Sequence, residues 1–207
     1  MSTIKTTNIT HGSNSGTANM VLASDGKVTV AEKKLYCPGT IIQVKQTYLS
    51  THESVSVGNN NAVVDYTTDN KLVVAITPTA ASSKILVTGH VNLGLSSQNL
   101  VYLCLKRSID GGTASNIGAS SDAGNRISAI AASRNNYTND TTCISVNYLD
   151  SPNTTDEVKY FYGLAHSASS SKTVYINTGH DQSGSSNNTA GGYGRTGSTI
   201  TVMEVAG

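Results

Sequence analysis

The sequence lacks tryptophan, contains one phenylalanine and three prolines, and has charged residues at only 13% of its 207 positions. An average globular protein has about 25% charged residues. Because Glu, Lys and Arg normally cover the exposed faces of helices, their scarcity excludes a mainly helical protein. The abundance of Ser, Thr, Asn and Gly predicts a strand-rich protein whose exposed faces are polar but uncharged.

An excess of charge of one sign is also missing. The chain has 14 Lys and Arg residues against 13 Asp and Glu residues, a net charge of +1 at pH 7. This balance excludes the basic footprint of a nucleic-acid-binding protein. No apolar run approaches the roughly 20 residues of a membrane-spanning helix, and the first residues, MSTIKTT, lack the apolar segment of a signal peptide. We therefore expect no nucleic-acid partner, no membrane insertion, and synthesis and folding in the cytoplasm.

The three cysteines, Cys37, Cys104 and Cys143, are widely spaced and form no Cys-x-x-Cys pair, so the sequence predicts no zinc cluster. Cys104 and Cys143 lie in strand-like segments, where we expect both to be small buried hydrophobic residues. The five histidines show no metal-ligand spacing.

Two patterns typical of enzymes occur in the sequence, but the residues around them do not fit an active site. Gly192–Gly197 has the G-x-G-x-x-G spacing of a dinucleotide site, but a strand follows it where such a site requires a helix. The carboxylates are scattered, and most lie in turn contexts, such as Asp110 before Gly-Gly and Asp150 before Ser-Pro. We therefore expect no catalytic residue, no metal ligand and no cofactor, and a protein that is not an enzyme.

Residues 1–38 differ from residues 39–207, and Cys37-Pro38-Gly39 marks the boundary. Two short strand signals, at residues 19–23 and 27–31, are joined by a turn at Ser24-Asp25-Gly26. Ordering the backbone costs about 1–2 kcal/mol per residue, and a buried aliphatic side chain returns only about 1.5–3 kcal/mol. This segment therefore cannot fold alone, and we interpret it as an N-terminal docking arm that pairs with partner strands. Its candidate docking residues are Ile4, Ile9, Met20, Val21, Leu22, Val28 and Val30.

From residue 40 onward, short apolar segments alternate with turn residues and none shows a helical period. They predict an all-β fold, an antiparallel sandwich whose long connections favour a jelly roll. The segment 129–133 is equally compatible with a helical turn, a strand or a loop. Expected strands cover residues 40–48, 62–66, 71–76, 84–93, 99–109, 142–149, 157–165, 173–177 and 198–205.

Two long polar loops, residues 111–141 and 178–197, are candidate contact regions. Ten of the eleven aromatic residues are tyrosines, which suit subunit interfaces and sugar-binding surfaces. We expect Tyr137 and Tyr193 to be exposed and name them, with Arg195, as candidate ligand contacts. The segments 71–76 and 160–164 are apolar at consecutive positions, which predicts a homotrimer whose subunits pack through sheet faces.

The two ends of the main segment are suggestive. The opening Pro38-Gly-Thr-Ile-Ile-Gln-Val44 and the closing Gly197-Ser-Thr-Ile-Thr-Val-Met-Glu-Val205 resemble the framing strands of virion structural proteins from tailed bacteriophages, marine and cyanobacterial ones in particular. Lys106-Arg-Ser-Ile-Asp-Gly-Gly112 is similar to a strand and hairpin of that family. Ile4-Lys-Thr-Thr-Asn-Ile9 and Leu22-Ala-Ser-Asp-Gly-Lys27 are similar to its anchoring segments.

The resemblance implies a homotrimer of jelly rolls of the tumour-necrosis-factor and C1q type, located in the virion and assembled in the host cytoplasm. It implies no catalytic residue. Two roles stay open. In the first, the protein decorates or cements the capsid, and its arm binds the major capsid protein or another virion protein. In the second, it is a tail-fibre tip or receptor-binding module that contacts host surface glycans.

Overall fold

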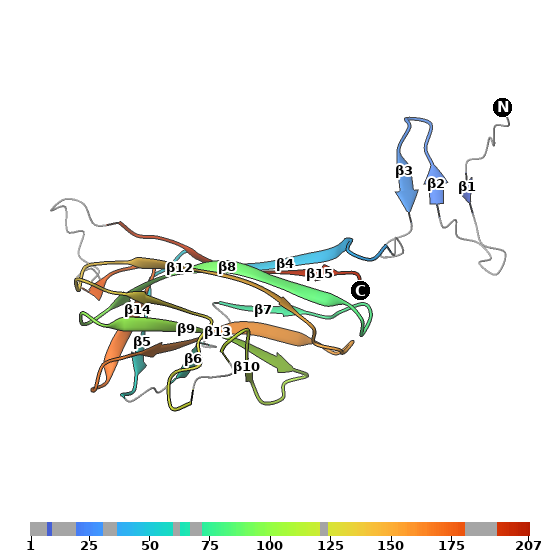
Figure 1. The fold of residues 1–207 in the computed structure, drawn as a ribbon. Helices are drawn as coiled ribbons and strands as arrows, with labels where there is room; N and C mark the ends of the chain where they lie inside the picture. The colour runs from blue at the N-terminus through green and yellow to red at the C-terminus, as the bar shows by residue number, and fades with distance from the viewer. Residues whose placement is uncertain are drawn as a thin grey trace.

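The computed structural model describes residues 8–9, 20–30, 37–59, 63–66, 72–120, 124–180 and 194–207, with only the backbone of Thr29 and Val30. All regular elements of these residues are β-strands, and every strand pairing is antiparallel (Figure 1). The described residues include no helix that could cross a membrane.

Two six-stranded sheets face each other in residues 41–205 (Figure 1). The first sheet contains β4 (Ile41–Leu49), β5 (Glu53–Val57), β8 (Lys84–Leu95), β12 (Thr142–Asp150), β14 (Lys172–Ile176) and β15 (Ser198–Val205). The second sheet contains β6 (Val64–Tyr66), β7 (Val73–Ile76), β9 (Leu100–Ile109), β10 (Ser115–Ile117), β11 (Ala131–Arg134) and β13 (Val158–His166).

Several short strands share one edge of a longer strand. In the first sheet, β15 and then β14 pair along the same edge of β8, while β12 pairs with its other edge. In the second sheet, β10 and β11 share one edge of β9, and β6 and β7 share one edge of β13. If strands that follow one another along the same edge are counted together as one ribbon, each sheet has four ribbons. When the ribbons are numbered along the chain, their order across the first sheet is first, eighth, third and sixth. Their order across the second sheet is second, seventh, fourth and fifth. This is a jelly roll, so the predicted all-β sandwich is confirmed.

The core lies between the two sheets and consists of the inward-facing side chains of both. Tyr160 and Tyr162 of β13 are its largest fully buried side chains. The Tyr162 hydroxyl donates a 3.2 Å hydrogen bond to the Thr199 carbonyl across the sandwich. A Cβ atom at Gly89 would lie 2.7 Å from this hydroxyl, so the close approach of β13 to β8 requires glycine there.

Residues before Pro38 form a separate three-stranded sheet of β1 (Asn8–Ile9), β2 (Met20–Leu22) and β3 (Val28–Val30). The predicted turn at Ser24-Asp25-Gly26 is present. Gly26 has a φ of 84°, and Ala23 and Lys27 are bonded across the turn. This is the usual three-residue hairpin loop with glycine at its left-handed position. Figure 1 draws this sheet beside one end of the jelly roll.

Four strands were not predicted: β1, β5, β10 and β11. The β5 sequence, Glu-Ser-Val-Ser-Val, carries only two apolar residues, and its strand state depends on pairing with β14. The predicted loop 111–141 contains β10 and β11, which complete the edge of β9. The ambiguous segment near residue 130 is therefore a strand in its second half, Ala131–Arg134.

Candidate functional site

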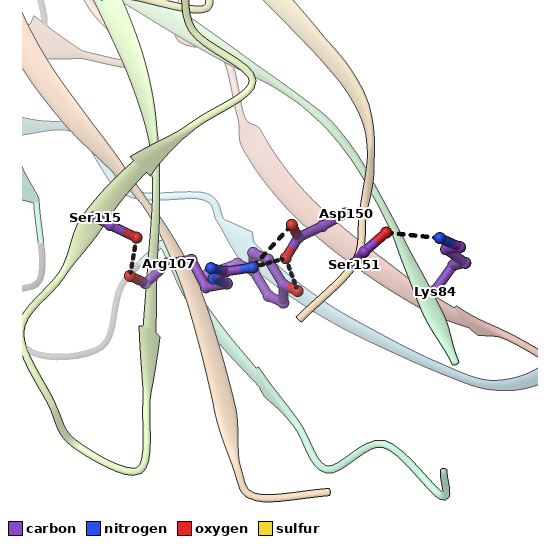
Figure 2. Close-up of polar contacts among 6 residues, drawn as sticks. Lys84, Arg107, Ser115, Asp150 and Ser151 are labelled. Carbon is purple, nitrogen blue, oxygen red and sulfur yellow. Dashed lines mark hydrogen bonds and ion pairs between the residues drawn. The ribbon is translucent and has the colours of Figure 1, made fainter. Parts of the chain in front are cut away.

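A polar cluster of Arg107, Asp150 and Tyr160 joins the two sheets (Figure 2). Arg107 of β9 donates to both carboxylate oxygens of Asp150 at 3.0 Å, and the Tyr160 hydroxyl donates to one of them at 2.7 Å. Asp150 is 4% exposed and was predicted to be a turn residue, which is wrong. Burial raises the pKa of Tyr160 above its ordinary value, and the hydrogen bond to Asp150 adds to this effect. The tyrosine therefore remains a neutral donor.

A second buried carboxylate, Glu204 of β15, lies in the same inward-facing row. Glu204 and Asp150 flank Ile85 on β8, one on each side. Glu204 accepts 2.6 Å hydrogen bonds from the Thr79 amide, the Thr79 hydroxyl and the Gln43 side chain. Burial alone would raise its pKa, but the hydrogen bonds from Thr79 and Gln43 outweigh burial, so the pKa of Glu204 is lowered.

The spacing of these two carboxylates is similar to that of a catalytic acid–base pair. Two strand spacings separate them, about 10 Å, which is near the separation of inverting glycosidases. However, both face the core and each is bonded by its own set of donors. Asp150 is 4% exposed and Glu204 is fully buried, so we interpret both clusters as structural links between strands. Among the described residues, no group of three His, Cys, Asp or Glu side chains could hold a metal ion.

The outward face of the first sheet carries a different feature, an apolar row that crosses four strands. The row consists of Val44, Met203, Leu86 and Leu149, which are direct cross-strand neighbours in β4, β15, β8 and β12. Val44 and Leu149 are each 53% exposed, and the two central residues are half-buried. None of the strands in Figure 1 lies over this face.

Two polar, uncharged rows lie next to the apolar row on the same face. The first consists of Gln46, Thr201, Thr88 and Asn147, and the second of Tyr48, Thr199, His90 and Ser145. One side-chain pair in each row is hydrogen-bonded: Gln46 with Thr201 at 2.8 Å, and Thr199 with His90 at 3.2 Å. No Asp, Glu, Lys or Arg stands in the three rows. We call these twelve residues the open face.

The predicted docking residues of the arm lie partly within the described residues. Ile9 and Val28 are 49% and 57% exposed, and Met20, Val21 and Leu22 are half-buried. Ile4 lies outside the described residues, and of Val30 only the backbone is described. The arm sheet thus leaves apolar side chains uncovered. In the described part of the chain, β1 and β3 each pair on one side only.

The predicted ligand contacts lie on loops. Tyr137 is 64% exposed, as predicted, in a turn closed by hydrogen bonds between residues 137 and 140. Arg195 is exposed, and Tyr193 lies outside the described residues. Tyr48 is also exposed, at 62%, although the sequence did not single it out.

The cysteine prediction is half right. Cys104 is fully buried on the outward side of β9, where its thiol donates to the Ser128 carbonyl at 3.4 Å. Burial raises the pKa of this thiol to about 11. Cys143 is exposed, which corrects the prediction that it is buried. It precedes Ile144, so it stands on the outward face of β12 while its apolar neighbour faces the core.

Sequence reasoning missed the open face, although a signal for it was present. In β4 and β12, alternation separates Val44, Tyr48 and Leu149 from the inward-facing residues. The strands cited for subunit contacts, 71–76 and 160–164, belong instead to the second sheet. There Phe161 is only 4% exposed because the chain itself covers it.

No protein-family model and no curated protein matches the sequence. Among solved structures, the chain is similar to that of the infectious bursal disease virus Gx strain, with 13% identity and a TM-score of 0.37 over 80% of this chain and 37% of that chain. For the T=1 particles derived from infectious bursal virus, the identity is 14% and the TM-score 0.38, over 87% and 39% of the two chains.

For the infectious bursal disease virus VP2 subviral particle, the identity is 10% and the TM-score 0.33, over 80% of this chain and 42% of that chain. This chain spans about two fifths of the length of those chains. Similarity at this level carries no argument about function.

Proposed function

We propose that the protein is a structural protein of a tailed-bacteriophage particle, where it forms homotrimers that decorate or cement the capsid. The observation that carries this proposal is the open face: an uncovered, uncharged surface with an apolar row on a jelly roll that is preceded by a separate arm. The resemblance of residues 38–44 and 197–205 to phage virion proteins supports the same function.

The open face supports association with further copies of the chain. Exposed apolar surface contributes about 25 cal/mol per Å² when it is buried, and the cores of subunit interfaces are depleted of charged residues. The row from Val44 to Leu149 spans four strands, so it offers a continuous apolar strip to a partner. Tyr48 adds a large, half-polar side chain of the kind enriched at interfaces.

The arm supplies the contact with the particle. Its apolar residues Ile9 and Val28 are exposed, and among the described residues its outer strand β3 pairs only with β2. An exposed strand edge is a template for strand addition by another chain. The partner in this role is the major capsid protein or another virion protein, and assembly takes place in the host cytoplasm.

Deletion of residues 1–35 tests this function. The backbone bonds of the jelly roll to its opening segment begin with Gly39, whose amide donates to Ala206 at 2.8 Å. The truncated protein should therefore fold and associate like the full chain, as circular dichroism and sedimentation would show. It should no longer bind to particles that lack this protein. Full occupancy of such particles by the truncated protein would refute the docking role of the arm.

The alternative function is a tail-fibre tip or receptor-binding module that contacts host glycans. The exposure of Tyr137 beside a turn at the end of the sandwich is the observation that favours it. Copy number per particle separates the two functions: hundreds of copies are expected for decoration, and a few tens or fewer for a fibre. Quantitative mass spectrometry of purified particles gives this number.

A further inference from the structure

A pocket of about 340 Å³ lies on the outward side of the second sheet, on the opposite side of the molecule from the open face. The turn after β9 forms one wall with Gly111, Gly112 and Ala114. Strands β6, β7, β9 and β13 supply the remaining lining residues: Asp65, Val73, Ser108, Lys159 and Phe161. Its volume lies at the lower end of the range for small-molecule sites.

The polar groups of the pocket converge from three strands and have unused bonding capacity. Asp65 forms an ion pair with Lys106, whose nitrogen lies 3.0 Å from the Oδ1 atom. That Oδ1 atom is buried and has no hydrogen bond of good geometry. Because the Asp65 side chain is nevertheless 38% exposed, its Oδ2 atom is the accessible acceptor.

Two further groups add donors. Ser108 lines the pocket, is 8% exposed and adds a hydroxyl. Among the described residues, the Lys159 ammonium is paired with Glu157 through an exposed contact of 3.4 Å, and such surface pairs are weak. The pocket thus presents one carboxylate acceptor, one hydroxyl that can donate or accept, and one ammonium donor.

The apolar part of the lining is the Phe161 ring with Val73 and Ala114. The charges balance, because Asp65 and Glu157 are matched by Lys106 and Lys159. A balanced site gives no advantage to a phosphate or to a cation. It suits a neutral molecule that has hydroxyls around its edge and an apolar C–H face.

We propose that this pocket binds a single hexopyranose unit, as the end of a glycan or as a free sugar. The pyranose hydroxyls bond Asp65, Ser108 and Lys159, and the C–H face of the ring packs against Val73, Ala114 and the accessible edge of Phe161. This inference goes beyond the decoration function and does not depend on it, because the pocket and the open face belong to different sheets.

Saturation-transfer difference NMR on the full-length protein tests the proposal, with the methyl glycosides of glucose, galactose, mannose and N-acetylglucosamine as probes. We expect at least one of them to give a saturable signal with a dissociation constant of about 1–10 mM, a range typical of very small ligands. The absence of a saturable signal from all four glycosides up to about 50 mM would overturn the proposal.

Ala114→Leu places extra side-chain volume in the pocket and leaves Asp65 and Lys106 untouched. It should weaken binding at least tenfold. Thr113→Leu is the matched control, because Thr113 is the exposed neighbour outside the pocket, and its affinity should equal that of the wild type. Equal affinity in the Ala114→Leu variant would place the sugar elsewhere and refute this site. Neither result bears on binding of the arm to particles.

Discussion

The outward-facing apolar residues of the two sheets differ in their exposure to solvent. On the second sheet, Cys104, Phe161 and Ala165 face outward and are almost completely buried, because loops and neighbouring strands of the same chain cover them. On the first sheet, Val44 and Leu149 face outward and are more than half exposed. An apolar residue on the outer side of a strand therefore indicates that something covers it, but the sequence does not say whether the cover is the same chain or another one.

Truncation of one apolar residue on each outward face tests whether the two faces differ, and it should have the largest effect. Phe161→Ala should lower the free energy of unfolding by about 3–4 kcal/mol at every protein concentration, since it removes a buried ring. Leu149→Ala should cost about 0.5 kcal/mol or less in the isolated subunit. Any further loss should appear only as weaker association and depend on concentration. Denaturant unfolding at several protein concentrations measures both variants, and equal, concentration-independent losses would show that the two faces do not differ.

Loss of the polar cluster that links the two sheets through Asp150 should have the next largest effect on stability. Asp150→Ala leaves Arg107 and Tyr160 without their shared acceptor, so we expect a loss of about 2–3 kcal/mol. Breaking a fully buried ion pair costs about 3–5 kcal/mol, and we place this variant lower because the Arg107 side chain is 22% exposed. Asp156→Ala, at an exposed turn position, is the control and should change stability by no more than about 0.5 kcal/mol. Urea unfolding compares the two, and a similar small change in both would mean that the cluster does not hold the sheets together.

The features that were predictable from the sequence depend on neighbouring residues, whereas those that were missed depend on residues far apart in the chain. Alternation along 84–93 and 99–109 predicted β8 and β9 because their inward residues are strongly apolar. The strand β5 and the burial of Asp150 were not predictable, since they depend on partners far away in the chain, β14 and Arg107. The open face required the register of four strands, which aligns Val44, Met203, Leu86 and Leu149 although they are distant in sequence. The exposure of Tyr137 was predictable from its polar surroundings alone.

Acid should weaken the first sheet through Glu204. The folded-state pKa of Glu204 is lowered from its usual value of 4.5, so the charged form is stabilised by folding. This contribution is complete above the pKa of the unfolded chain and is lost as the pH falls through the lowered folded-state pKa. In Glu204→Gln, the decline of unfolding free energy below about pH 4.5 should be shallower than in the wild type, because the group that titrates is removed. Glu157→Gln, an exposed carboxyl, should retain the steep decline; identical acid profiles for all three proteins would contradict this assignment.

The smallest effect concerns two cysteines that report on the two outer faces. Cys143, on the first sheet, should react with a thiol reagent at pH 8 within minutes, as should the exposed Cys37. Cys104, on the second sheet, should react only on unfolding, because burial raises its pKa to about 11 and shields the sulfur. Counting modified thiols by mass spectrometry before and after denaturation checks this difference. Rapid modification of Cys104 in the native protein would show that the second sheet is not covered.

Sedimentation velocity of the full-length protein and of its Leu149→Asp variant tests the central claim, that the open face binds further copies of the chain. The wild type should sediment as a trimer of 21.5 kDa subunits, and Leu149→Asp should sediment as a folded monomer because it places a charge in the apolar row. Thr113→Asp, in the exposed connection between β9 and β10, should remain trimeric. A wild-type protein that sediments as a monomer, or a Leu149→Asp variant that stays a trimer, would contradict the account.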